Sequence, residues 1–317
     1  MTTQRLELNI VRLLRPRQWI KNFAIFAAIT FSGQLFNLHI LSNVIIGFLI
    51  FCGLSSASYV VNDIFDIEKD KLHPFKKFRP LAHGDIPIPV ALTIAAAIVV
   101  FSLYFSFHIT PAFFVVSLIY LAVQLLYSMF LKSVEIIDIL AIASGYIIRV
   151  YAGEFATSGL HISVWLLLTT ISLALFIAIG KRRSELTLIS QNKQANIAAI
   201  RKTLSHYSER LLDLYASIFA TSVFISYALF TFLENPQGFK PGINILLPDF
   251  LPAFFQRKWL MITIIPVVYG LMRYLQDIYE KHEGESPEKV LLSDKALLST
   301  VIIWLIMVLV ILYVIVP

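Results

Sequence analysis

The chain has 317 residues, of which 58% are hydrophobic and only 15% are charged. Soluble domains are nearer half apolar and a quarter charged, so the composition excludes an ordinary water-soluble protein and indicates a membrane protein. The net charge of +6 does not indicate a nucleic-acid partner, because the basic residues lie in segments between long apolar runs. The one cysteine, Cys52, excludes an intrachain disulfide.

Nine apolar segments are each close to the length that crosses a bilayer, the first of them being short. They cover residues 22–37, 39–61, 88–107, 111–130, 137–156, 162–180, 212–233, 258–278 and 296–316. The sequence therefore predicts an all-α membrane protein, with a bundle of about nine transmembrane helices that forms a single domain over residues 1–317. The basic start is followed by no clear small-x-small cleavage site, so we expect the first helix to be retained.

The distribution of basic residues predicts the orientation of the chain. Of the 26 Lys and Arg residues, 22 fall in segments that lie inside if the N-terminus is inside, 3 fall outside, and Arg149 lies within a span. The positive-inside rule then predicts a multi-pass protein of the inner cell membrane with its N-terminus inside. An odd number of spans puts Pro317 outside, and the long charged links all face the cytoplasm.

The first candidate site residues stand where span one begins, in the run Arg15-Pro-Arg-Gln-Trp-Ile-Lys-Asn22. Four of them are candidate substrate-binding residues: Arg17, Gln18, Lys21 and Asn22. On a helix the first three share a face, and the last two lie deeper than topology alone requires. The competing explanation is that the run marks the membrane interface.

An acidic run at the inner end of span two, Asn62-Asp-Ile-Phe-Asp-Ile-Glu-Lys-Asp70, is the strongest signal. If the helix continues, Asp63, Asp66 and Asp70 share one face, and the i, i+4, i+8 row beside it begins at Asn62. Carboxylates this close repel one another unless a cation lies between them, and oxygen-only ligands suit Mg²⁺. We predict that the three aspartates are catalytic and bind Mg²⁺ together with Asn62. A solvated acidic helix end is the alternative.

Basic residues follow within ten positions of the acidic run. Lys76, Lys77 and Arg79 are the candidate phosphate-binding residues of this link. Metal ions that bridge some oxygens of a diphosphate, with cationic side chains on the others, form a suitable site for it. Juxtamembrane lysines also contact anionic lipid headgroups, which is the competing explanation.

Spans four and five contribute further candidate substrate-binding residues. Tyr127 and Lys132 close span four, Asp138 opens span five, and Arg149 lies about half-way through span five. An arginine at that depth requires a partner or a water-filled cavity. Arg149 therefore either binds a substrate or forms a structural pair, for instance with Glu154.

Three consecutive cations, Lys181, Arg182 and Arg183, stand at the end of span six, where we expect a loop to begin. They either bind a substrate phosphate or only enforce topology. Since three adjacent side chains cannot all point into one pocket, we expect at least one of them to be essential.

At these residues the sequence resembles the UbiA-type superfamily of intramembrane prenyltransferases. The signature Asn-Asp-x-x-Asp-x-x-x-Asp over residues 62–70, within a frame of nine helices, is typical of that superfamily. Its usual second acidic motif, Asp-x-x-x-Asp after helix six, is replaced here by Lys181-Arg-Arg-Ser-Glu185.

Five segments resemble one branch of the superfamily, the decaprenyl-phosphate phosphoribosyltransferases. They are residues 15–22, 70–80, 180–186, 207–213 and 284–294. The resemblance implies an Mg²⁺-dependent enzyme of cell-wall biosynthesis that transfers a 5-phosphoribosyl group from phosphoribosyl diphosphate to a polyprenyl phosphate and releases diphosphate. A lipid monophosphate requires cations, which agrees with a basic run in place of the second acidic motif.

Two alternatives stay open. An ordinary UbiA-type prenyltransferase moves a prenyl group from a prenyl diphosphate to an aromatic acceptor. A transporter lines a pathway with its buried charges, but a pathway needs polar residues at both membrane faces and here they gather at one. The expected partners are a polyprenyl phosphate, phosphoribosyl diphosphate and the membrane, and the sequence leaves open whether the chain is a monomer or a homo-oligomer.

Overall fold

A computed structural model describes residues 3–72, 76–157, 159–191, 206–234, 258–280 and 287–315, and every regular element in these ranges is helical. Eight helical segments within them are long and apolar enough to cross a membrane. They are α3 (Leu38–Phe65), α6 (Ile88–Ile109), α7 (Pro111–Met129), α8 (Ile137–Ala156), α9 (Val164–Gln191), α11 (Glu209–Leu233), η5 with α14 (Trp259–Thr263 and Ile264–Glu280), and α16 with η6 (Lys295–Val310 and Ile311–Ile315). This confirms the all-α membrane fold.

The first expected span, residues 22–37, is not one long α-helix. It consists of the 3-10 helix η1 (Pro16–Phe26) and the short helix α2 (Ala27–Phe31). A 3-10 run of 11 residues is unusual, because its hydrogen bonds have poorer geometry than those of an α-helix. Close packing on α8 accompanies it: a Cβ at Gly153 would collide with the carbonyl oxygen of Ile25, so only glycine permits this approach.

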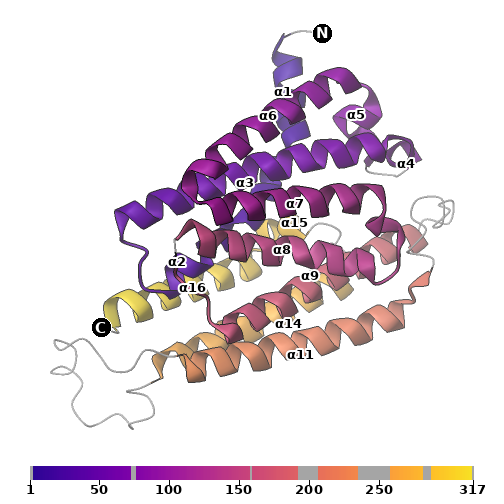
Figure 1. Ribbon diagram of the computed structural model, residues 1–317. Coiled ribbons are helices and arrows are strands. Elements are labelled where there is room, and N and C mark those ends of the chain that lie inside the picture. Colours follow the sequence, from indigo (N-terminus) through magenta and orange to yellow (C-terminus); the bar gives the residue numbers. More distant parts are fainter. Residues whose placement is uncertain are drawn as a thin grey trace, which may run out of the picture.

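This broken segment still runs from one end of the bundle to the other. At one end Arg15 contacts Asp63, and at the other Tyr313 donates a hydrogen bond to the carbonyl of Thr30 (2.8 Å). In Figure 1 the C-terminus lies at the opposite end from α4 (Ile67–Leu72) and α5 (Pro80–His83). The chain between Arg15 and Tyr313 therefore makes an odd number of crossings, as expected. Which end faces the cytoplasm stays a prediction, and Pro317 lies outside the described residues.

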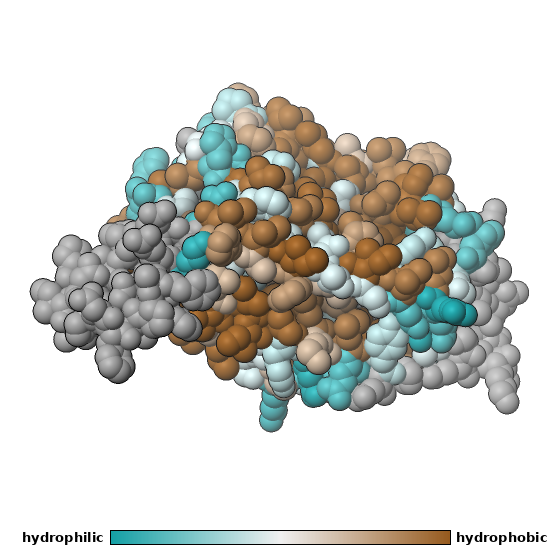
Figure 2. All heavy atoms as spheres, turned by 90° about the horizontal axis from the view of Figure 1, so that it is seen from below, coloured by the Kyte–Doolittle hydropathy of each residue, from teal (hydrophilic) through white to brown (hydrophobic). Residues whose placement is uncertain are grey.

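The outer surface is apolar where lipid would contact it. Val100 and Phe101 on α6, and Ile303 and Ile306 on α16, are all exposed. Figure 2 shows a broad hydrophobic region across the middle of one face, with hydrophilic residues towards its ends. Soluble monomers rarely expose apolar patches of this extent. The chain is therefore a multi-span membrane protein whose outer helices face the bilayer.

The elements that carry polar residues meet at the α4 end of the bundle. The last turn of α3 leads into α4 and then into η2 (Lys76–Phe78), while η3 (Leu131–Ser133) connects α7 to α8 at the same end. The short helix α15 (Pro287–Ser293) contacts η1 and α9. Segments that are far apart in the sequence are thereby brought around one cavity.

Candidate active site

A polar cavity opens at the α4 end, lined from η1, α3, α4, η2, α7, η3, α8, α9 and α15. The predicted site residues that line it are Gln18, Lys21, Asn62, Asp66, Asp70, Lys76, Arg79, Tyr127, Lys132, Arg149 and Lys181. The predicted residues that do not line it are Arg17, Asn22, Asp63, Lys77, Asp138, Arg182 and Arg183. Residues from distant segments thus converge, although the convergence is not complete.

Two of the non-lining residues are exposed outside the cavity. Arg17 and Lys77 both point to the surface, and Lys77 lies over the ring of Phe78 at 5.1 Å. These positions suit contact with lipid headgroups, which was the competing explanation for the basic residues.

The acidic signature is divided between the cavity and the protein interior. The α-helix is interrupted only at Asp66, and the amide of Asp70 donates to the carbonyl of Asp66 (2.8 Å), so helical spacing is kept. The row of Asn62, Asp66 and Asp70 lines the cavity. Asp63 does not, contrary to expectation, because its side chain turns inward to Arg15 (2.6 Å) and is 2% exposed.

Each acidic residue of the row has a basic partner. Lys132 Nζ lies 2.8 Å from Asp66 Oδ1, and Arg79 Nη1 lies 2.6 Å from Asp70 Oδ2. Arg79 also reaches Asp63 Oδ1 at 3.1 Å, so it connects two carboxylates. Burial and the charge of Asp63 raise the pKa of Asp70, and the Arg79 guanidinium offsets part of that rise. The acidic and basic motifs that the sequence predicted to act together are therefore in direct contact.

The donor chemistry of the row fits Mg²⁺. Asn62, Asp66 and Asp70 offer only oxygen ligands, as this ion prefers. Among the described residues, no three His, Cys, Asp or Glu side chains form a ready metal cluster. Mg²⁺ does not require one, since it usually takes one or two carboxylates and completes its shell with waters and substrate phosphates.

Arg149 reaches the cavity from within the membrane-spanning part of α8. It is 4% exposed, and its Nε and Nη2 donate to Asn22 Oδ1 (2.6 Å) and to the Tyr120 hydroxyl (2.9 Å). Glu154, the partner considered from the sequence, contacts His161 instead (2.8 Å). Asn22 is therefore placed behind Arg149, where it orients the guanidinium and does not face the cavity itself.

The cationic run 181–183 lies within α9, so the expectation that a loop begins there is wrong. No Gly or Pro interrupts the helix between residue 180 and its end. Successive residues of an α-helix are turned by about 100°, and the three side chains accordingly point in three directions. Lys181 lines the cavity, Arg182 is fully buried against Asp138 (2.7 Å), and Arg183 contacts Asp213 (2.7 Å).

Several lining residues were missed by the sequence analysis, among them Arg15, Tyr59, Glu185 and Glu288. Arg15 and Glu288 belong to segments 15–22 and 284–294, whose resemblance to a known branch was the available signal. The hydrophobic periodicity of the sequence does not indicate that Arg15 and Glu288 lie at the same cavity. The hydrogen bond from Gln18 to Glu288 joins residues 270 positions apart, and only the fold brings them together.

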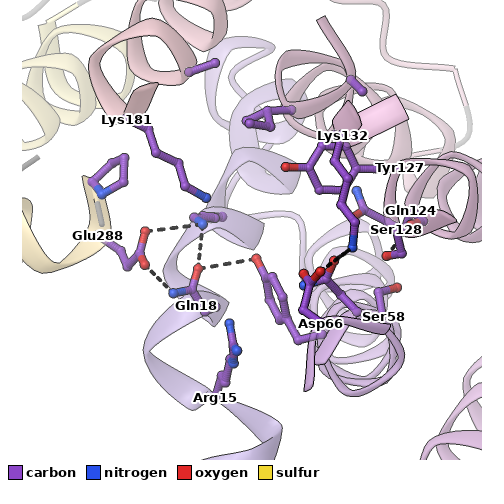
Figure 3. Close-up of a pocket in the computed structure, with 18 of the residues that line it drawn as sticks. Arg15, Gln18, Ser58, Asp66, Gln124, Tyr127, Ser128, Lys132, Lys181 and Glu288 are labelled. Carbon is purple, nitrogen blue, oxygen red and sulfur yellow. Dashed lines mark hydrogen bonds and ion pairs between the residues drawn. The ribbon is translucent and has the colours of Figure 1, made fainter. Parts of the chain in front are cut away.

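Two groups of side chains face each other across the cavity in Figure 3. On one side, Lys132 contacts Asp66 beside Tyr127. On the other side lie Lys181, Gln18 and Glu288, and Gln18 donates a hydrogen bond to Glu288. The group around Asp66 includes the acidic row. The group around Glu288 contains one carboxylate, together with amide and ammonium groups. The cavity thus offers two chemically different surfaces to a ligand.

Comparison with known proteins places the chain in a family. The model of the UbiA prenyltransferase family matches residues 23–295. The chain belongs to this family. The match includes the acidic row and seven of the eight long membrane-spanning segments. Of the eighth segment, α16 with η6, it includes only the first residue.

Two curated relatives of the UbiA chain described here carry the name decaprenyl-phosphate phosphoribosyltransferase. The protein from Corynebacterium glutamicum is 34% identical over 300 residues, which cover 93% of this chain and 84% of that protein. The protein from Mycolicibacterium smegmatis is 33% identical over 301 residues, with 94% and 90% covered.

Solved structures share the fold of this UbiA-family chain. A UbiA homolog from Archaeoglobus fulgidus bound to GPP and Mg²⁺ superposes with a TM-score of 0.64, at 19% identity, over 95% of this chain and 99% of that one. A digeranylgeranylglyceryl phosphate synthase superposes with a TM-score of 0.61 at 17% identity, over 97% and 99%. At this identity the likeness shows the common fold.

Proposed function

We propose that the protein transfers a 5-phosphoribosyl group from phosphoribosyl diphosphate to a polyprenyl phosphate and releases diphosphate. The observation that carries the proposal is the side of the cavity formed by α9, where the superfamily usually has its second acidic motif. Here α9 presents Lys181 to the cavity, and its acid, Glu185, is neutralised by Arg182 (2.8 Å) and Lys76 (3.0 Å). This surface suits a phosphate, not a second metal cluster. The names of the curated relatives support the same activity.

In the proposed reaction, the lipid phosphate oxygen attacks the anomeric carbon of the ribose from the face opposite the diphosphate. The bond from this carbon to the diphosphate oxygen breaks as the bond to the lipid phosphate forms, so the configuration inverts. The chain needs no general base, because a phosphate is already anionic at neutral pH. Mg²⁺ bound at Asn62, Asp66 and Asp70 would neutralise charge on the leaving diphosphate.

The basic partners of the acidic row are placed to hold the same leaving group. Lys132 and Arg79 form ion pairs with the carboxylates of Asp66 and Asp70. The diphosphate of the donor would bind at the same place. Charge-assisted hydrogen bonds to phosphate oxygens are stronger than neutral ones. These two residues would therefore orient the donor and stabilise the charge that the diphosphate acquires.

The assay that tests the proposal uses purified protein with labelled phosphoribosyl diphosphate, a polyprenyl phosphate and Mg²⁺. We expect the label to appear in a lipid product and diphosphate to be released in equal amount. If the protein forms no such product but couples a prenyl diphosphate to an aromatic acceptor, it is an ordinary prenyltransferase.

Lys181→Ala should lower kcat/KM by roughly 10- to 100-fold, because a charge-assisted contact contributes about 1.5–3 kcal/mol and about 1.4 kcal/mol corresponds to a factor of ten. Initial rates would be measured with each substrate varied in turn at saturating Mg²⁺. Lys77→Ala is the matched control, since Lys77 is an exposed cation that does not line the cavity. If both variants stay within about twofold of wild type, Lys181 contacts no substrate phosphate.

We also place the active site on the cytoplasmic side of the inner membrane, on the basis of the positive-inside rule. A cytoplasmic reporter fused after Glu283 and a periplasmic reporter fused after Pro317 should both be active, and both fusion points lie outside the described residues. An outside signal from the Glu283 fusion would put the acidic row in the wrong compartment for a cytosolic sugar diphosphate.

A further inference from the structure

One carboxylate of the cavity stands apart from the acidic row. Glu288, in the first turn of α15, faces the cavity from the side opposite Asp66 (Figure 3). Its side chain is 5% exposed, and Gln18 donates a hydrogen bond to its Oε1. Burial alone would raise the pKa of Glu288, but the ammonium groups of Lys21 and Lys181 lower it below its ordinary value. The side chain is therefore an anion within a site that must bind other anions.

The second oxygen of this carboxylate faces an ammonium group and keeps lone-pair capacity for a further donor. Lys21 Nζ forms an ion pair with Glu288 Oε2 at 3.2 Å and also donates a hydrogen bond to Gln18 Oε1. Within the part of the chain that the structure describes, no donor has hydrogen-bond geometry towards Glu288 Oε2. Buried polar atoms in proteins almost always have a partner. Glu288 lines the cavity, and a carboxylate oxygen accepts more than one hydrogen bond, so a donor on a ligand is expected to complete the contacts of this carboxylate.

Phosphate groups are unsuitable partners for that oxygen. Ionised phosphate oxygens are acceptors and carry negative charge, so they repel a carboxylate at short range. A sugar hydroxyl is suitable because its O–H donates. The surroundings agree, since Tyr59 places its hydroxyl 3.3 Å from Gln18 Oε1. Glu288, Gln18 and Tyr59 together form a cluster of acceptors and donors that matches hydroxyls, and a prenyl diphosphate has none to offer.

We propose that Glu288 is a specificity residue that accepts a hydrogen bond from a ring hydroxyl of the pentose donor, with Gln18 holding the carboxylate in place. This proposal deepens the proposed function and rests on it. The sugar would then lie between the acidic row, where its diphosphate binds, and the Glu288 side of the cavity. Lys21 and Lys181 on that side remain placed to bind a phosphate.

The test measures binding without the lipid acceptor, so that no transfer occurs. Labelled phosphoribosyl diphosphate is displaced by ribose 5-phosphate, by its 2-deoxy and 3-deoxy forms, and by inorganic diphosphate. Wild-type protein should bind ribose 5-phosphate at least roughly tenfold more tightly than one of the deoxy forms, since a hydrogen bond to a charged acceptor is worth a factor of that order. Inorganic diphosphate, which carries no sugar, reports on the phosphate-binding residues alone.

Glu288→Ala should bring the ratio of ribose to deoxyribose affinity to within about twofold of one. Glu288→Gln keeps the shape of the side chain and should reduce the ratio at least threefold, while affinity for inorganic diphosphate stays equal or rises as a negative charge is removed. Glu154→Gln is the matched control, because this carboxylate is mostly buried (14% exposed) beside His161 and does not line the cavity. Its ratio should equal that of wild type.

A different pattern would overturn the assignment. If Glu288 serves only as the counter-ion of Lys21 and Lys181, both Glu288 variants will change the affinity of every ligand by a similar factor and leave the ratio at the wild-type value. A second result would also overturn the assignment of Glu288 without affecting the proposed function. In that result, the wild-type protein binds phosphoribosyl diphosphate but binds ribose 5-phosphate no more tightly than it binds the two deoxy forms. Only a failure of wild type to bind phosphoribosyl diphosphate would remove the proposed function as well.

Discussion

Asp66→Asn is expected to lower kcat/KM on the order of a thousandfold while leaving the helical bundle folded. A metal-bridged diphosphate supplies several kcal/mol of charge stabilisation in the transition state, and each factor of ten corresponds to about 1.4 kcal/mol. Asp66 is the more exposed of the two lining aspartates, with 18% of its side chain accessible against 6% for Asp70. Asn has the same shape, so packing at this helix end should persist. Initial rates at saturating Mg²⁺ and the thermal unfolding temperature in detergent would be measured together.

The control for this variant lies two residues further along the chain, on α4. Glu68→Gln removes a carboxylate that is 84% exposed, pairs with Lys71 and does not line the cavity, so its rate should match wild type. Asp70→Asn should resemble Asp66→Asn in rate. Near-normal turnover in both aspartate variants, with Mg²⁺ still required, would refute the assignment of the acidic row as the metal site.

The spans were predictable because hydropathy depends on the residues of one segment at a time. Long apolar runs such as 88–107 and 111–130 can satisfy their backbone hydrogen bonds in a membrane only as helices, and α6 and α7 follow them closely. Residues 22–37 were the exception. Their 3-10 form accompanies close contact with α8 at Gly153, and the hydropathy of the segment itself contains no information about that contact.

The site was predictable in composition but not in detail. Helical spacing identified two candidate rows, 62-66-70 and 63-66-70, without indicating which one faces the cavity. Arg15 and Arg79 decide this by holding Asp63 inward, and they come from outside the acidic run. Glu288 could not be predicted to oppose Asp66 either, since its position depends on how α15 packs against η1 and α9.

Arg182→Ala is expected to reduce the free energy of unfolding by about 3–5 kcal/mol, the usual effect of removing one partner from a buried ion pair. Arg182 and Asp138 are both 0% exposed and Glu185 is 3% exposed, with Arg182 lying 2.7 Å and 2.8 Å from their carboxylates. Tyr207 also donates to Asp138 (2.9 Å), but this one hydrogen bond does not replace a charge. Removing the guanidinium therefore leaves the buried carboxylate of Asp138 without its cation and leaves Glu185 with Lys76 (3.0 Å). Thermal and denaturant unfolding in detergent would measure the loss.

Arg183→Ala provides the matched comparison, because it removes the same charge from the next position of the same helix. Its partners Asp213 and Glu209 are 39% and 48% exposed, and ion pairs of that kind contribute about 0–1 kcal/mol. A large difference in stability between the two variants would confirm that Arg182 holds α8 and α9 together behind the cavity. If instead Arg182→Ala is as stable as Arg183→Ala but inactive, Arg182 must reach the substrate during turnover, and the buried arrangement of Arg182, Asp138 and Glu185 cannot be the catalytic one.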